Sequence, residues 1–351
     1  MMKSGFGLPM LVAVATAVGA CSTTVTGTPE PDTTPTMFGL PVTTADKVTF
    51  DTLDQVRSVD PCGFVDRARF AEQGVITLLG PSTKIDQCAV GFTPNGERNG
   101  SFLYVDLDHQ PPLGTDTSRQ IAGESIVVSG PDTYGNCDFK VPLRFPMPAS
   151  TTDEDAKVVE VPTLAYASVS SSSFDSSELG CRLAEDIVVE IVEAFRGDRI
   201  PRRSAAATPV SDIAVMARNP CEIVAVLPAH VRLDRLEAAF EPTECSFWVA
   251  GSGPIADPIT IGYEITRRPL APTGTDRELI EADGVPVLVY RQPLPDPMCV
   301  ETFATGAELD PTVGGTDHSG AVVQPIVRIS GSCAVTEQIR PAAMHLFGAT
   351  A

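Results

Sequence analysis

The placement of its cysteines constrains this chain more than any other feature. Of nine cysteines, Cys21 lies near the N-terminus and the other eight form two groups of four. Neighbouring cysteines are 26, 49 and 44 residues apart in the first group and 24, 54 and 34 residues apart in the second. An even number of widely separated cysteines is typical of a disulfide framework in an exported protein and not of a zinc site. The eight are Cys62, Cys88, Cys137, Cys181, Cys221, Cys245, Cys299 and Cys333.

The segments around these cysteines are repeated in the same order. Asp60-Pro61-Cys62 corresponds to Asn219-Pro220-Cys221, and Gln87-Cys88 corresponds to Glu244-Cys245. In each group a phenylalanine follows the last cysteine by 14 residues. Self-similarity of this kind indicates a duplicated unit. We therefore predict two tandem similar modules.

Each group of four cysteines allows three connectivities. The first and last cysteines of a group open predicted helical segments, whereas the two middle ones lie in or beside predicted strands. Pairing neighbours along the chain joins each helix to the sheet, and this interpretation favours the following disulfides: Cys62 with Cys88, Cys137 with Cys181, Cys221 with Cys245, and Cys299 with Cys333.

The hydrophobic pattern between the cysteines predicts an α+β fold. Apolar residues at four-residue intervals predict an amphipathic helix over 182–195, and its counterpart over 336–347 should be kinked or split by Pro341. Alternating or β-branched runs predict strands at 102–108, 125–128, 158–166, 259–265, 285–289 and 322–329. Their short connections favour an antiparallel sheet flanked by an N-terminal and a C-terminal helix. The serine-rich segment 168–177 is predicted to form a surface loop.

The N-terminal residues have the layout of a lipoprotein signal. One basic residue, Lys3, precedes an apolar run that is too short to span a bilayer. Val18-Gly19-Ala20-Cys21 is similar to the bacterial lipobox, so diacylglycerol on Cys21 is expected to anchor the chain to a membrane. The predicted organisation is a signal peptide over 1–20, lipidated Cys21 with a Thr/Pro-rich tether over 21–47, module 1 over 48–197, a linker over 198–210, and module 2 over 211–351.

The charge of the chain limits its partners. Forty-five acidic residues against 25 basic ones give a formal net charge of -20. Nucleic acids and anionic lipid surfaces attract clustered Lys and Arg, so neither is an expected partner of the folded modules.

The lipobox, the tether, and Asp-Pro-Cys or Asn-Pro-Cys opening a helix before a later cysteine resemble a group of actinobacterial cell-envelope lipoproteins of unknown function. The chain is more distantly similar to the extracellular sensor domain of mycobacterial receptor Ser/Thr kinases. The resemblance covers about residues 48–348. It implies an extracytoplasmic ligand-binding or sensing role and transfers no catalytic residue.

A search for catalytic motifs finds no nucleophile elbow, zinc-protease motif or phosphate-binding loop. The remaining candidates are the acidic cluster at Asp106, Asp108 and His109, the run Asp317-His318-Ser319, and Trp248, which is expected to pack on a disulfide. We predict a non-enzymatic protein without metal or cofactor that binds an envelope protein or small ligand. The alternatives are a structural wall-associated lipoprotein and an envelope hydrolase.

Overall fold

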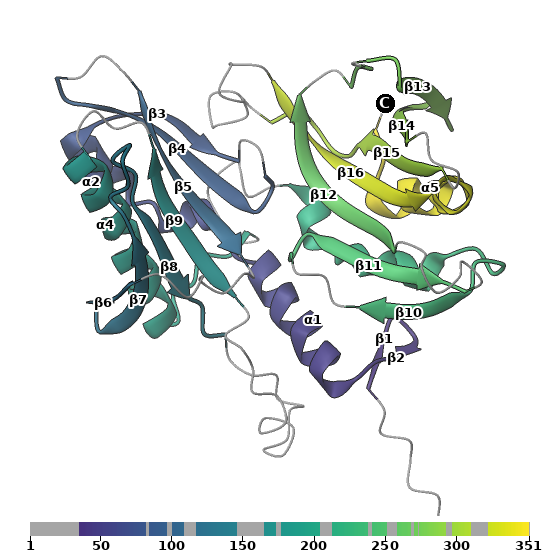
Figure 1. Cartoon of the computed structure of the whole chain (residues 1–351), viewed down its shortest axis with the longest axis horizontal. Helices are drawn as coiled ribbons and strands as arrows, with labels where there is room; N and C mark the ends of the chain where they lie inside the picture. The colour runs from purple at the N-terminus through teal and green to yellow at the C-terminus, as the bar shows by residue number, and fades with distance from the viewer. Residues whose placement is uncertain are drawn as a thin grey trace, which may run out of the picture. The chain divides into compact units, whose positions relative to one another are not determined.

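Figure 1 shows a computed structural model in which two seven-stranded antiparallel sheets carry the fold. The structure describes residues 35–81, 84–96, 100–108, 117–145, 165–172, 177–203, 213–237, 241–250, 258–267, 270–272, 274–292, 297–309 and 322–350. The predicted signal peptide and Cys21 therefore lie outside the described residues. No described helix is long and apolar enough to cross a membrane.

The first sheet has the strand order β3-β4-β5-β9-β8-β7-β6, and every pair in it is antiparallel. Its strands are β3 (Gly74–Gly80), β4 (Gln87–Pro94), β5 (Ser101–Asp108), β6 (Thr117–Ile121), β7 (Glu124–Ser129), β8 (Asp138–Pro142) and β9 (Tyr166–Ser172). The helical segments α1 (Thr44–Arg57), η1 (Pro61–Phe64) and α2 (Arg67–Gln73) precede it, and α4 (Ser177–Arg196) follows it and packs on β8 and β9.

The second sheet has the strand order β10-β11-β12-β16-β15-β14-β13, again antiparallel throughout. Its strands are β10 (Leu233–Glu237), β11 (Glu244–Val249), β12 (Ile259–Arg267), β13 (Arg277–Ala282), β14 (Val285–Gln292), β15 (Met298–Ala304) and β16 (Val323–Ser332). The short 3-10 helices η4 (Ala214–Ala217) and η5 (Pro220–Val226) precede it, and α5 (Cys333–Phe347) packs on β15 and β16.

The two sheets share one topology. Counted along the chain, the strands of each sheet lie in the order first, second, third, seventh, sixth, fifth, fourth. The predicted mixed α+β class with antiparallel sheets is thereby confirmed. One difference is that the second sheet is preceded by 3-10 turns in place of the predicted N-terminal α-helix. Proline at N1 starts η5, and a capping box of Asn219 and Glu222 holds its first turn.

The N-terminal segment differs from the predicted tether. Residues 36–47 include the hairpin β1 (Thr36–Met37) and β2 (Leu40–Pro41) and the start of α1. The Thr43 hydroxyl caps that helix by accepting a hydrogen bond from the Asp46 amide at 3.0 Å. Because this segment makes its own turns and caps, its high Thr and Pro content does not produce an extended chain.

The hydrophobic core of the second sheet takes residues from the first half of the chain. Val42 and Phe50 from the N-terminal segment, and Ile85 from the turn before β4, are buried in the same cluster as Ile261 of β12. Val56, in the last turn of α1, belongs instead to the core of the first sheet. One helix therefore contributes to both cores, and all described residues belong to one compact unit, Thr34–Ala351.

Two local predictions differ from the structure. Residues 168–172 of the predicted surface loop form part of β9, a strand between β5 and β8, and Ser177 is the first residue of α4. Pairing on both sides overrides the weak β-propensity of serine, and the buried Ser171 hydroxyl accepts a hydrogen bond from the Cys137 amide at 3.0 Å. α5 runs as one helix from Cys333 to Phe347 with Pro341 inside it, so Pro341 does not split it, and Ile339 and Ala343 on either side are buried in the core.

Candidate functional site

Four disulfides tie helical segments to strands. Cys62 of η1 bonds to Cys88 of β4, and Cys221 of η5 bonds to Cys245 of β11. Cys181 of α4 bonds to Cys137, the residue before β8. Cys333, the first residue of α5, bonds to Cys299 of β15. These are the pairs that the sequence analysis favours. All eight half-cystines are engaged, so none is available as a thiol nucleophile or metal ligand.

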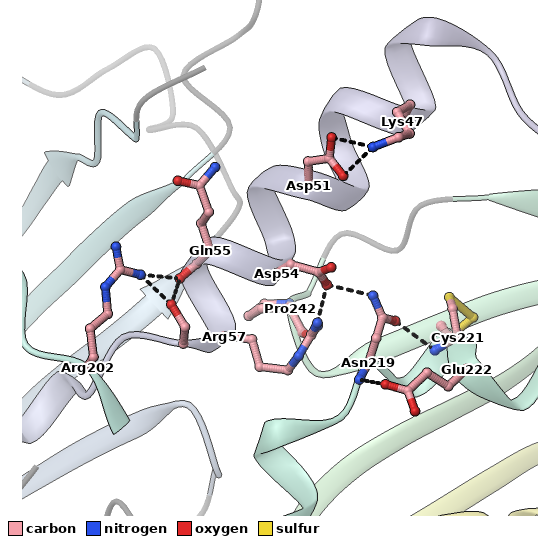
Figure 2. Close-up of polar contacts among 12 residues, drawn as sticks. Lys47, Asp51, Asp54, Gln55, Arg57, Arg202, Asn219, Cys221, Glu222 and Pro242 are labelled. Atoms are coloured by element: carbon pink, nitrogen blue, oxygen red, sulfur yellow. Dashed lines mark hydrogen bonds and ion pairs between the residues drawn. A yellow bond between two sulfur atoms is a disulfide. The ribbon is translucent and has the colours of Figure 1, made fainter. Parts of the chain in front are cut away.

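A polar junction joins α1 to the residues around η5 (Figure 2). Asn219 Nδ2 donates to Asp54 Oδ1 at 2.6 Å, and Arg57 pairs with the same carboxylate while donating to the Pro242 carbonyl at 2.7 Å. Asn219 Oδ1 also accepts from the Cys221 amide at 2.8 Å. The buried Arg57 guanidinium thus has both a carboxylate and a carbonyl partner. This junction is structural, since its hydrogen bonds hold α1 beside the second core.

A groove crosses the second sheet on the face away from α5. Along β15, Cys299 and Phe303 are buried towards the core, so the alternating residues Val300 and Thr302 point to the other face. The groove has a volume of about 350 Å³, within the range of small-molecule sites. It is lined by Glu264, Thr266, Leu270, Arg277, Leu288, Tyr290, Val300, Thr302, Ile326 and Arg328.

Strand register sets the order of the lining residues. Tyr290 pairs with Val300, and Leu288 pairs with Thr302, so these four side chains form a square on β14 and β15. Thr302 pairs in turn with Arg328 on β16. Tyr290 and Leu288 are half-buried, and the groove therefore has an apolar part beside a cationic side chain.

Three charged side chains line the groove. Arg328 lies 3.5 Å from the Glu264 carboxylate, so its charge is partly balanced. Arg277, on the edge strand β13, lies over the Tyr290 ring with its Cζ atom 5.7 Å from the ring centroid. Among the described residues Arg277 has no carboxylate partner. The lining thus has an excess of one positive charge in a chain whose net charge is -20.

The equivalent face of the first sheet has different chemistry. Counting from Cys137 and Cys299, Val300 corresponds to Asp138, and the strand registers align Tyr290 with Ser129 and Arg328 with Ser168. The shared topology therefore accepts small polar or acidic residues at these three positions. By the same registers Lys140, Val127 and Tyr166 of the first sheet align with Thr302, Leu288 and Ile326. What the fold does not require is the combination of Tyr290, Val300 and Arg328 in the second sheet.

The structure does not bring the other sequence candidates into a site. Asp106 Oδ1 accepts a hydrogen bond from Gln87 Nε2 at 2.9 Å, while the Asp108 side chain, His109, and the run Asp317-His318-Ser319 lie outside the described residues. No group of three or more described His, Cys, Asp or Glu residues can hold a metal ion.

Trp248 does not pack on a disulfide as expected. Cys245 and Phe247 point to the core, so Trp248 lies on the opposite face of β11, where the Arg235 guanidinium covers its ring at 3.9 Å. The groove residues were missed because half-buried positions on a strand face give no functional signal individually. A residue-by-residue alignment of the two halves shows Val300 and Tyr290 at positions where the first half has Asp138 and Ser129.

Comparison with protein-family models, with curated proteins and with solved structures finds no match to this chain.

Proposed function

We propose that this protein is an exported lipoprotein that binds a ligand in the cell envelope without chemical conversion, through the groove on the second sheet. The observation that carries the proposal is this groove, in which Tyr290, Val300 and Arg328 stand where the first sheet, of the same topology, has Ser129, Asp138 and Ser168. Four disulfides are consistent with folding in an oxidising compartment. The signal peptide, the lipid anchor on Cys21 and the tether rest on the sequence.

The two halves are proposed to be tandem copies of one module. The same order of seven strands and the same placement of two disulfides support this duplication. After a duplication, the surface residues of one copy can change while those of the other copy are retained. In this proposal the second module has become the binding module.

Capture from envelope extracts tests the binding role. Val300→Asp introduces the residue that the first module has at the equivalent position, so the fold should accept it. Val75→Ser is the control, because Val75 is 62% exposed on β3 of the first sheet. We expect mass spectrometry to find a molecule retained by the wild type and by Val75→Ser and lost from Val300→Asp. Equal retention by all three proteins would contradict binding at the groove.

Metabolic labelling with palmitate tests the anchor. Cys21→Ser removes the proposed attachment point, so the label and membrane association should both disappear. Continued labelling of this variant would show that Cys21 is not lipidated.

A further inference from the structure

Resting on the binding role proposed for the groove, we propose that its ligand is a single-chain amphiphile with one acidic head group and an aliphatic tail. Two features of the groove support this class of ligand: an apolar patch on β14 and β15 and a nearby cationic rim. Each constrains one end of the ligand.

The apolar part has the dimensions of a hydrocarbon tail. Tyr290 pairs with Val300, and Leu288 lies two residues along β14 from Tyr290, so these three side chains form one apolar patch on β14 and β15. Ile326 pairs with Ala304 and lies on β16 beyond Thr302. Neighbouring strands are about 4.8 Å apart, so the lining from β14 to β16 extends roughly 10 Å across the sheet. Leu270 completes the apolar lining. A volume of about 350 Å³ accommodates a single chain and is small for a protein segment with its side chains.

The cationic rim selects the head group. Arg277 lies at the edge strand beside Tyr290, and it is the lining cation without a carboxylate partner among the described residues. An acidic head placed there forms a charge-assisted hydrogen bond with the guanidinium. The tail then extends from Tyr290 towards Leu288 and Val300. A cationic head would meet Arg277 with the same sign of charge.

The chain's overall charge argues against the other source of acidic amphiphiles, an intact membrane surface. A net charge of -20 repels an anionic bilayer, whereas a single molecule responds mainly to the local charge of the groove. The ligand is therefore expected to be bound as an individual molecule.

Calorimetric titration of the whole chain carrying Cys21→Ser, which lacks the proposed lipid, tests the proposal with three probes of equal chain length below their micellar concentrations. Dodecanoate should bind with a stoichiometry of one, dodecanol more weakly, and dodecylamine most weakly. Arg277→Gln should weaken dodecanoate binding about three- to tenfold and leave dodecanol unchanged, because only the acidic head contacts the guanidinium. Val300→Asp and Tyr290→Ser, which copy the first module, should abolish binding of both. Val75→Ser should bind like the wild type.

Three results would overturn the proposal: no binding of dodecanoate, equal affinity for dodecylamine, or groove-dependent binding to phosphatidylglycerol vesicles. If dodecanoate fails while Val300→Asp still loses the molecule captured from envelope extracts, the binding role holds and the ligand class is wrong. If both experiments are insensitive to Val300→Asp, the proposed function itself fails.

Discussion

At the scale of single residues, a buried ion pair in the second half replaces an apolar contact of the first. The fully buried Glu301 accepts hydrogen bonds from Arg340 at 2.5 and 2.8 Å and from the Thr336 hydroxyl at 2.9 Å. Counting from the matching cysteines, the equivalent residues of the first half are Phe139, Ala184 and Val188. All three are buried in the first core, so positions that are apolar there carry a charged and hydrogen-bonded group in the second half.

Breaking this ion pair should be costly, whereas replacing it completely should not. Glu301→Ala leaves the Arg340 guanidinium without its partner and should lower the free energy of unfolding by about 3 to 5 kcal/mol. The triple variant Glu301→Phe, Thr336→Ala, Arg340→Val copies the first half and should recover most of this loss. Urea denaturation measures both. A triple variant less stable than Glu301→Ala would show that the two sites are not equivalent.

Tyr263 is a second position at which the second half has a polar group where the first half has an apolar residue. The strand registers align it with Leu107, and its buried hydroxyl has no hydrogen-bond partner among the described residues. Burial raises the pKa of the phenol, which stays neutral. Tyr263→Phe keeps the edge-to-face contact with Phe347 and removes an unsatisfied group, so we expect stability to rise by about 1 kcal/mol. Thermal unfolding provides the measurement, and a clear loss of stability would indicate a bonded hydroxyl.

At the scale of elements, α1 is the feature that links the two cores. Phe50 is 2% exposed in the second core although it precedes the first sheet in sequence. Phe50→Ala should destabilise the protein by about 3 to 5 kcal/mol and increase native-state hydrogen exchange in the second sheet. The fluorescence of Trp248, the only tryptophan in the chain, should also change when Phe50→Ala loosens the second sheet, because Trp248 lies on β11.

Phe70→Ala is the matched control for this prediction. Phe70 is 1% exposed and packs edge-to-face on Phe92 in the first core. Its loss should increase exchange in the first sheet. If both variants act mainly on the first sheet, α1 does not support the second core as described.

The elements that were predictable from sequence are those with strong local periodicity. The helix of residues 182–195 and the strand of residues 259–265 have clear apolar patterns, and both are present. α4 starts five residues before the predicted helix, at Ser177, and ends at Arg196, whereas β12 starts at Ile259 as predicted and runs two residues further, to Arg267. The serines of β9 have no such pattern, because their strand depends on partners distant in sequence. The segment 36–50 folds into a local hairpin and a capped helix, but the burial of Val42 and Phe50 in the second core has no sequence signal. The groove was not predictable for the same reason, since strand pairing assembles it from five strands and a loop residue.

At the scale of the whole molecule, stability should depend on pH through Asp86. Burial, with repulsion from Glu241 and Asp106, raises the pKa of this carboxyl to about 7, against an opposing effect of Lys84. Between about pH 4 and 7 the unfolded chain therefore loses a proton that the folded chain keeps, and stability falls as pH rises. Asp86→Asn should remove this fall and gain up to roughly 4 kcal/mol relative to the wild type at pH 7. Chemical denaturation at several pH values measures it, and parallel curves for the two proteins would contradict it.

The contact of residues 36–50 with the second core also determines how the molecule bears mechanical load. With the proposed anchor at Cys21, a pull between membrane and bound ligand enters through β1, β2 and α1. Tension would reach Val42 and Phe50 before any strand of the first sheet. A force transmitted from the membrane would therefore act first on the half of the protein that contains the groove.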